Sequence, residues 1–304
     1  MRPTYKSAHA GFTLIEMITV IAIMGIVAAA VAGFIRVPMQ LYQDAQRRAS
    51  ITDAANTAFA LLKRDLQNSL PNSVRVTLVG AVYHLEFLQT RTGGRYRAAD
   101  SNPSASWSAN HCPDGNANSL AEEDVLQFGV ADTCFTTLGA LANLATIVTG
   151  SDFLAIYNLG PGFANADAYA SGAATGGNKS LITSVAAGSG GANVISFSSN
   201  TFNLESPGRR FHVISGPVSY ACDTGAGTLN RYSGYAITAA QQTPPPGTPA
   251  LLARGVTGCT IVYDQNVINQ RQGVVSIWLS LTAPADPGGG GVNLFQQVQV
   301  SNVP

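Results

Sequence analysis

The chain has 304 residues, and its 17 lysine and arginine residues balance its 17 aspartate and glutamate residues. Nucleic acid is therefore not an expected partner, because its binding needs a basic surface. The hydrophobic share of 46% is too high for a long disordered chain, and four cysteines are too few for a disulfide-dense miniprotein of this length.

The N-terminal region combines a short polar leader with a long apolar run. Residues 1–11 contain Arg2 and Lys6 and no acid, and residues 12–35 are almost unbroken apolar sequence. A helix over residues 12–35 spans about 36 Å, enough to cross a hydrocarbon core of roughly 30 Å. The basic leader favours a cytoplasmic N-terminus, which would place the rest of the chain outside the inner membrane.

Two ordinary explanations of this segment fit poorly. A cleaved secretory signal has an apolar region of only about 7–15 residues, followed by a small-residue cleavage site. A plain membrane anchor fits the length but leaves Glu16 unexplained. A carboxylate in a spanning helix costs roughly 2.5–3.5 kcal/mol near the bilayer centre and less near an end, so it needs a partner.

The sequence GFTLIE at residues 11–16 resembles the class III signal of type IV pilins and their relatives. This resemblance implies that a prepilin peptidase cleaves after Gly11 and that Phe12, the new N-terminal residue, is N-methylated. It also implies that Glu16 pairs with the terminal amine of a neighbouring subunit and sets the register of assembly. The physics agrees, because a charge inside a dry helix bundle gains most from an opposite charge.

One position departs from the pattern of the major pilins, which have a helix-kinking proline near the twenty-second residue of the mature chain. Gly33 occupies that position here, and the first proline after the leader is Pro38. The departure favours the minor pilins and pseudopilins, with Pro38 placing any kink slightly later.

Residues 36–70 are expected to continue the helix beyond the membrane. Four apolar residues recur at spacings of four, three and four and so share one helical face: Ala55, Phe59, Leu62 and Leu66. Pro71 ends this helix, because a proline disfavours a helical conformation in the residue before it. The stripe is expected to pack on a sheet of the same chain.

The remaining residues, 71–304, predict a β-rich head with long loops, so the expected fold class is α+β with mostly antiparallel strands. Strand-like runs occur at residues 74–78, 83–88, 125–130, 153–157, 194–197, 210–214, 216–220, 260–263, 274–281 and 292–300. Residues 91–94 are expected to form a turn, and the Gly-rich residues 160–191 a long excursion. The last two runs predict a hairpin with a long loop.

All four cysteines, Cys112, Cys134, Cys222 and Cys259, follow the apolar segment, which places them in an oxidising compartment. Four cysteines allow three pairings, and the local pairs Cys112–Cys134 and Cys222–Cys259 are favoured. Zinc is a poor alternative because the chain has no C-x-x-C pair and only His111 adjoins a cysteine.

Further short segments extend the resemblance. Residues 65–75, 93–97, 207–211 and 216–222 resemble the O-type biogenesis proteins of mannose-sensitive haemagglutinin pili, and the general size and order resemble the large J-type pseudopilins of type II secretion. Both families imply a low-copy subunit in a tip or priming complex. The implied partners are the prepilin peptidase/N-methyltransferase, other minor and major pilins, and the inner-membrane assembly platform.

Signals for chemistry are weak. Residues 172–180 resemble a phosphate-binding loop, but Asn178 separates Gly177 from Lys179, which breaks the required spacing, so an exposed loop is expected. Asp114, Asn116 and Asn118 have calcium-loop spacing, yet the required glycine and glutamate are missing after them. We expect no catalytic residues, no metal and no cofactor. An adhesive tip or an anchored periplasmic enzyme remain the alternatives.

Overall fold

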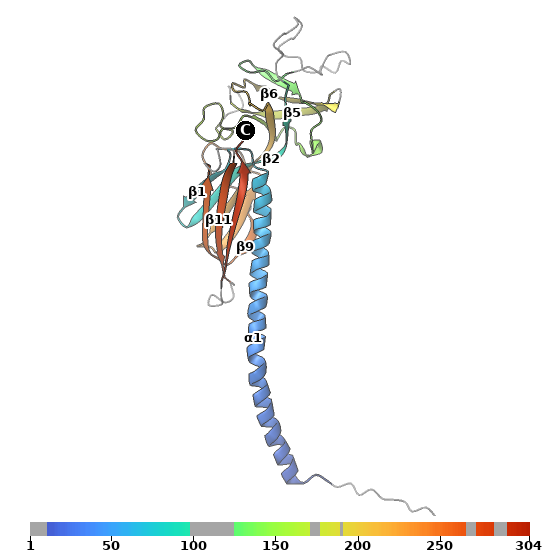
Figure 1. Cartoon of the computed structure of the whole chain (residues 1–304), viewed down its shortest axis with the longest axis vertical. Coiled ribbons are helices and arrows are strands. Elements are labelled where there is room, and N and C mark those ends of the chain that lie inside the picture. The colour runs from blue at the N-terminus through green and yellow to red at the C-terminus, as the bar shows by residue number, and fades with distance from the viewer. Residues whose placement is uncertain (1–10, 98–124, 171–176, 189–190, 266–271, 283–290) are drawn as a thin grey trace, which may run out of the picture. The chain divides into compact units, whose positions relative to one another are not determined.

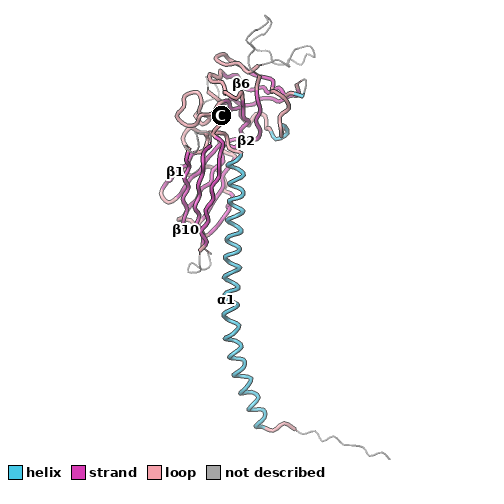
Figure 2. Tube along the Cα trace, viewed as in Figure 1, coloured by secondary structure: helices cyan, strands magenta, loops and turns pink. Residues whose placement is uncertain are grey.

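The computed structural model describes residues 11–97, 125–170, 177–188, 191–265, 272–282 and 291–304. The chain divides into two compact units, Met1–Ser50 and Ile51–Pro304. The fold is α+β: one long N-terminal helix and an antiparallel β-rich head, as the sequence predicts (Figures 1 and 2).

Helix α1 runs from Leu14 to Gln67 and continues through Pro38. Its first part owes its helical form to a nearly continuous apolar sequence that carries few strong helix breakers. Its last turns carry the predicted stripe, and Ala55, Phe59, Leu62 and Leu66 are all buried, as their spacing predicts. The helix stops before Pro71, and Asn72 adopts a left-handed φ of 59° where the chain turns into the first strand.

The strands form two sheets, and every pair of named strands is antiparallel. The nine-stranded sheet has the order β1-β2-β7-β4-β5-β6-β3, with β8 paired to β7 and β9 paired to β8. Its strands are β1 (Arg75–Val79), β2 (Val82–Arg95), β3 (Asp132–Thr136), β4 (Phe153–Ile156), β5 (Lys179–Ala187), β6 (Asn193–Asn200), β7 (Arg210–Asp223), β8 (Thr228–Ser233) and β9 (Ala250–Arg254). A short 3₁₀ helix, η2, spans Leu144–Thr146.

The second sheet has three strands in the order β10-β11-β12 and is drawn orange to red in Figure 1. These strands are β10 (Val256–Asp264), β11 (Gln272–Leu281) and β12 (Val292–Ser301). The pair β11–β12 is regular along its whole length, from Gln272 opposite Ser301 to Leu281 opposite Val292. The predicted C-terminal hairpin is therefore confirmed.

Two large hydrophobic clusters both draw on residues of the long strand β7. The first contains the stripe of α1, Leu85 of β2 and Tyr220 of β7, and residues of the three-stranded sheet. The second contains Phe135 and Ile195 together with Phe211 of β7. Because β7 is 14 residues long, its later residues contribute to the first cluster and its earlier residues to the second.

Two loop predictions are wrong. Residues 91–94 are strand, not turn, because Gly93 and Gly94 let β2 approach β7 closely. A Cβ on Gly94 would lie 2.9 Å from Leu141 and from the Phe211 ring. The predicted excursion at residues 160–191 contains β5, since Ser180 and Ile182 are buried against neighbouring strands. Residues 125–130 form no strand beyond an isolated bridge at Phe128, and β3 begins at Asp132.

Candidate functional site

Gly11 and Phe12 lie immediately before α1, in extended chain that is exposed on all sides. A Cβ on Gly11 would meet nothing within 4 Å, and its φ lies outside the left-handed region. The fold of this chain therefore does not require glycine at position 11. Phe12 is 85% exposed and has no packing role within the described chain.

Glu16 belongs to the first turn of α1, and its side chain is bonded to Thr13. The Thr13 backbone N–H and the Thr13 hydroxyl each donate to Glu16 Oε2 at 3.0 Å. In return, the Glu16 N–H donates to Thr13 Oγ1 at 3.4 Å. This reciprocal arrangement is a capping box, with Thr13 as N-cap and Glu16 three residues later. The acid expected in the apolar segment thus has a partner within its own chain.

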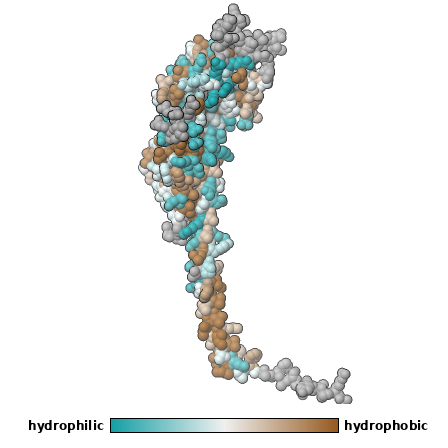
Figure 3. All heavy atoms as spheres, viewed as in Figure 1, coloured by the Kyte–Doolittle hydropathy of each residue, from teal (hydrophilic) through white to brown (hydrophobic). Residues whose placement is uncertain are grey.

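The apolar segment presents its side chains to the surroundings on every face. Long aliphatic and aromatic residues are exposed along the whole run, among them Leu14, Ile15, Ile21, Met24, Ile26 and Phe34. They form the apolar stretch along the lower part of α1 in Figure 3. By length and composition, α1 is the one helix of the described chain that could cross a membrane. This fits a membrane-anchored pilin-like protein.

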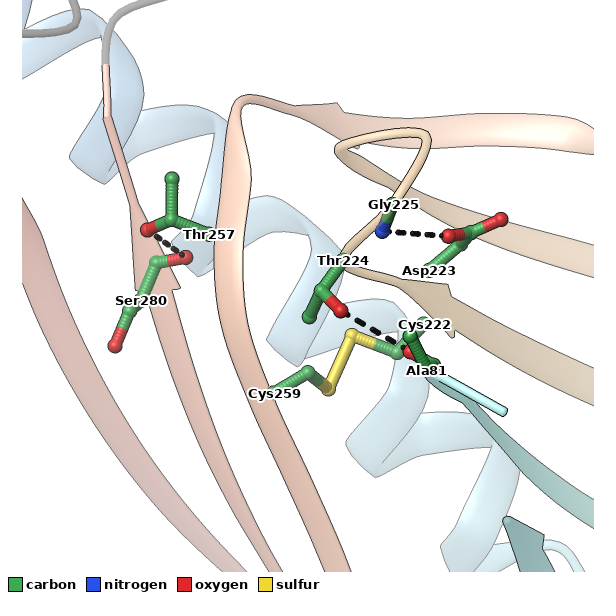
Figure 4. The surroundings of a disulfide bond; sticks show 8 residues. All are labelled: Ala81, Cys222, Asp223, Thr224, Gly225, Thr257, Cys259 and Ser280. Carbon is green, nitrogen blue, oxygen red and sulfur yellow. Dashed lines mark hydrogen bonds between the residues drawn. A yellow bond between two sulfur atoms is a disulfide. The ribbon is translucent and has the colours of Figure 1, made fainter. Parts of the chain in front are cut away.

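A disulfide joins Cys222 of β7 to Cys259 of β10, with Cα atoms 6.4 Å apart (Figure 4). This is the pairing that the sequence favoured, and it links the nine-stranded sheet to the three-stranded sheet. The turn after β7 is fixed by Asp223, whose Oδ1 accepts from the Gly225 N–H at 2.8 Å (Figure 4). Cys134 is also disulfide-bonded, whereas its predicted partner Cys112 lies outside the described residues.

A buried acid near the end of α1 ties the helix to the head. Asp65 Oδ2 accepts a hydrogen bond from the Tyr220 hydroxyl at 2.8 Å and from Arg231 Nε at 2.7 Å. Burial and the Asp65 carboxylate both raise the pKa of Tyr220, so its hydroxyl stays protonated and donates. Asp65 therefore fixes the rotation of the last helical turns against β7 and β8.

Lys179 corrects the expectation of an exposed loop for residues 177–180, whereas residues 172–176 of that predicted loop lie outside the described residues. It is buried at the start of β5, and its Nζ donates to the Ala168 carbonyl oxygen at 2.6 Å. Burial lowers the pKa of Lys179 to about 8, with Asp167 opposing the shift. Asn178 is buried as well. These contacts hold Lys179 inside the head.

The two described histidines, His84 of β2 and His212 of β7, sit in strands. Burial lowers the pKa of His84, with Asp223 opposing the shift. Burial, followed by the Arg210 charge, lowers the pKa of His212 to about 4. Within the part of the chain that the structure covers, His84 Nδ1 and His212 Nε2 have no hydrogen-bond partner.

The calcium-like residues Asp114, Asn116 and Asn118 lie outside the described residues, as does His9 of the leader. Among the residues with described positions, no group of three or more His, Cys, Asp or Glu side chains could hold a metal ion.

Comparison with known proteins gives one result. Residues 6–32 match the family described as the prokaryotic N-terminal methylation motif. The match covers Gly11, Phe12 and Glu16, supports a type IV pilin-like or pseudopilin-like N-terminus, and is consistent with processing by prepilin peptidase and assembly with other pilins. The chain has no significant match to any curated protein or solved structure.

Thr13 is the residue at this end of the chain that the sequence analysis missed. Its signal was present, because a threonine followed three residues later by glutamate, just before an apolar run, is the signature of a capping box. The long-range partners of Asp65 had no comparable local signal.

Proposed function

We propose that this protein is a minor pilin, or pseudopilin-like subunit, that helps to start the assembly of a type IV pilus or caps its tip. Prepilin peptidase would cleave after Gly11 on the cytoplasmic side, and Phe12 would be N-methylated. The apolar start of α1 would then leave the bilayer and pack against the helices of other pilins above the inner-membrane assembly platform. The head would remain periplasmic, or be carried to the tip, and the chain itself would catalyse no reaction.

One observation carries this proposal: the N-terminal methylation motif leads directly into a long apolar helix that continues into a β-rich head. A membrane anchor alone needs only the apolar length. The motif adds a glycine that the local fold does not require and an acid in an apolar segment. Cleavage at the glycine and pairing of the acid explain both features.

The system we favour is the mannose-sensitive haemagglutinin type of pilus, on the short sequence resemblances to its O-type biogenesis proteins. The absence of proline at position 33 supports a minor subunit. A J-type pseudopilin of type II secretion has the same N-terminal chemistry and is the second candidate. An adhesive tip subunit that binds a surface ligand through the loops of its head is the third.

The test is mass spectrometry of the N-terminus in two fractions, sheared surface filaments and cell envelope, with abundance measured relative to the major subunit. We expect a chain that begins at methylated Phe12 and is scarce in filaments. A cleaved chain confined to the envelope and required for secretion would favour the pseudopilin. An uncut chain found only in the envelope would contradict the proposal.

Gly11→Ala is the matched variant for this experiment. The added Cβ has open space around it, so the variant should fold as the parent does. We expect it to remain uncut and to be absent from filaments. Full function of the uncut variant would instead support an anchored periplasmic enzyme, whose activity needs no cleavage.

A further inference from the structure

Thr13 forms hydrogen bonds to the Glu16 carboxylate, the group that the proposed assembly step uses. Its N–H and its hydroxyl both donate to Glu16 Oε2 at 3.0 Å, and it accepts from the Glu16 N–H in return. A glutamate side chain has several rotatable bonds and would otherwise sample many rotamers. The two bonds to Oε2 hold it in one rotamer, folded toward the N-terminal end of its own helix.

We propose that Thr13 is the positioning residue for Glu16, which holds the carboxylate in place before and during subunit assembly. The inference rests on the proposed function, because it concerns the same acid. It assigns to Thr13 a role separate from cleavage.

The first reason is the state of the chain before assembly. An unassembled subunit has no amine from a neighbouring subunit near Glu16, yet its acid lies within an apolar segment, where an unpaired carboxylate is costly. The cap supplies two donors from Thr13, and the N-terminal end of a helix favours negative charge. Thr13 therefore lets the single chain hold Glu16 in the membrane until a partner arrives.

The second reason is that the cap leaves room for that partner. Both donors from Thr13 use Oε2, so the other carboxylate oxygen, Oε1, is left to accept from an ammonium group. Cleavage after Gly11 would create an ammonium on Phe12, the residue next to Thr13. The cap and an ion pair between subunits can therefore coexist, and the cap restricts where Oε1 lies when the subunits meet.

The experiment compares three variants of the full chain in cells. Thr13→Val keeps the shape of the side chain and removes its hydroxyl, whereas Thr13→Ser keeps the hydroxyl. Thr19→Val is the matched control, since the Thr19 hydroxyl donates to the Glu16 carbonyl oxygen at 2.9 Å and not to its carboxylate. Incorporation into filaments, or into the priming complex, is expressed per cleaved chain, so that an effect on the peptidase is not counted as an effect on assembly.

We expect Thr13→Val to lower incorporation roughly threefold to tenfold, in line with the contribution of an N-cap. Thr13→Ser and Thr19→Val should stay near the parent level. If Thr13→Val blocks cleavage altogether, Thr13→Ala takes its place. Equal loss in Thr13→Val and Thr19→Val would overturn the inference, because it would indicate a general effect of removing a hydroxyl.

A double variant separates positioning from simple helix stability. In a Glu16→Gln background, Thr13→Val should cause little further loss, because the two residues act as one unit. Fully additive losses would contradict the inference. If Glu16→Gln alone leaves incorporation unchanged, the proposed function fails. If Glu16→Gln impairs incorporation while Thr13→Val does not, only the role of Thr13 fails.

Discussion

Asp65 is almost completely buried and accepts from two side chains that lie far away in the sequence, Tyr220 and Arg231. In Asp65→Asn the amide keeps one acceptor oxygen, but Arg231 loses its counter-charge. Arg231 remains partly exposed, so water screens part of this loss. We expect a decrease of about 1–3 kcal/mol in the free energy of unfolding.

Urea unfolding of the detergent-solubilised full chain measures this change. Asp53→Asn is the control, since Asp53 lies exposed on the same helix. Equal stability of the two variants would show that the contacts of Asp65 contribute nothing.

The lowered pKa of His212 predicts how the free energy of unfolding depends on pH. Its pKa is about 4 in the folded chain, against an ordinary value of 6.5, chiefly because it is buried. Between pH 4 and pH 6.5 the unfolded chain binds more protons than the folded chain, so the free energy of unfolding increases with pH over this range. The corresponding stability is lost as the pH falls from about 6.5 to 4. The loss attributable to His212 is at most about 3 kcal/mol.

Replacing the group tests this assignment. In His212→Gln the decrease in unfolding free energy between pH 6.5 and 4.5 should be smaller than in the parent chain, while His84 remains in both proteins. Parallel pH profiles of the two proteins would rule out His212 as the source.

At the level of single residues, the sequence predicts what depends on near neighbours. Gly11, Phe12 and Glu16 form a contiguous motif, and even the overlooked Thr13 has a local signature. Lys179 was wrongly expected in an exposed loop, because its buried position depends on a hydrogen bond to the Ala168 carbonyl oxygen of a neighbouring loop. No spacing rule predicts such a contact, because tertiary packing decides it.

Among the elements, the disulfide Cys222–Cys259 joins β7 to β10 across 37 positions of sequence. Its removal should lower the free energy of unfolding by about 4 kcal/mol in the chain-entropy model. The double variant Cys222→Ala/Cys259→Ala isolates this bond, because Cys134 keeps its own disulfide. Chemical denaturation with and without reductant measures the loss. A variant as stable as the oxidised parent would contradict it.

Replacing Gly94 tests whether β2 and β7 approach each other closely at this position. An alanine there would place its Cβ 2.9 Å from Leu141 and from the Phe211 ring. We expect Gly94→Ala to destabilise the head by about 1–3 kcal/mol through overpacking. Arg95→Ala, at an exposed position of the same strand, is the control for thermal unfolding. A turn, as the sequence suggested, would tolerate the alanine.

The helix and the C-terminal hairpin were predictable because their patterns are local: a stripe at helical spacing, and two apolar runs flanking a loop. The long strand β7 was predicted as two short ones, 210–214 and 216–220, although it runs unbroken through Gly216 and Pro217. Their neighbours on β2, Leu88 and Gln89, hold this region in the sheet. Pairing between distant strands decided the outcome, and a single sequence does not display it.

At the scale of the whole molecule, the division after Ser50 predicts that assembly and head stability are separable. Glu16→Ala should leave cleavage after Gly11 intact and lower the amount of this subunit in filaments. The melting temperature of the head should stay unchanged. Mass spectrometry of filaments and thermal unfolding of the solubilised chain measure the two effects. Normal incorporation of the variant would contradict the proposed role of Glu16 in setting the register of assembly.

The hydrophobic cluster that includes the stripe of α1 draws on residues from Ala55, in that helix, to Val300, near the end of the chain. A chain that is exported starting from its N-terminal side exposes the stripe of α1 long before β12 emerges. If the head is exported to the periplasm, as we propose, it would be unable to close its main core until nearly all of it had crossed the export channel. Throughout that interval its apolar surface would be open to periplasmic chaperones and proteases, so the rate of export would set how long the nascent subunit is vulnerable.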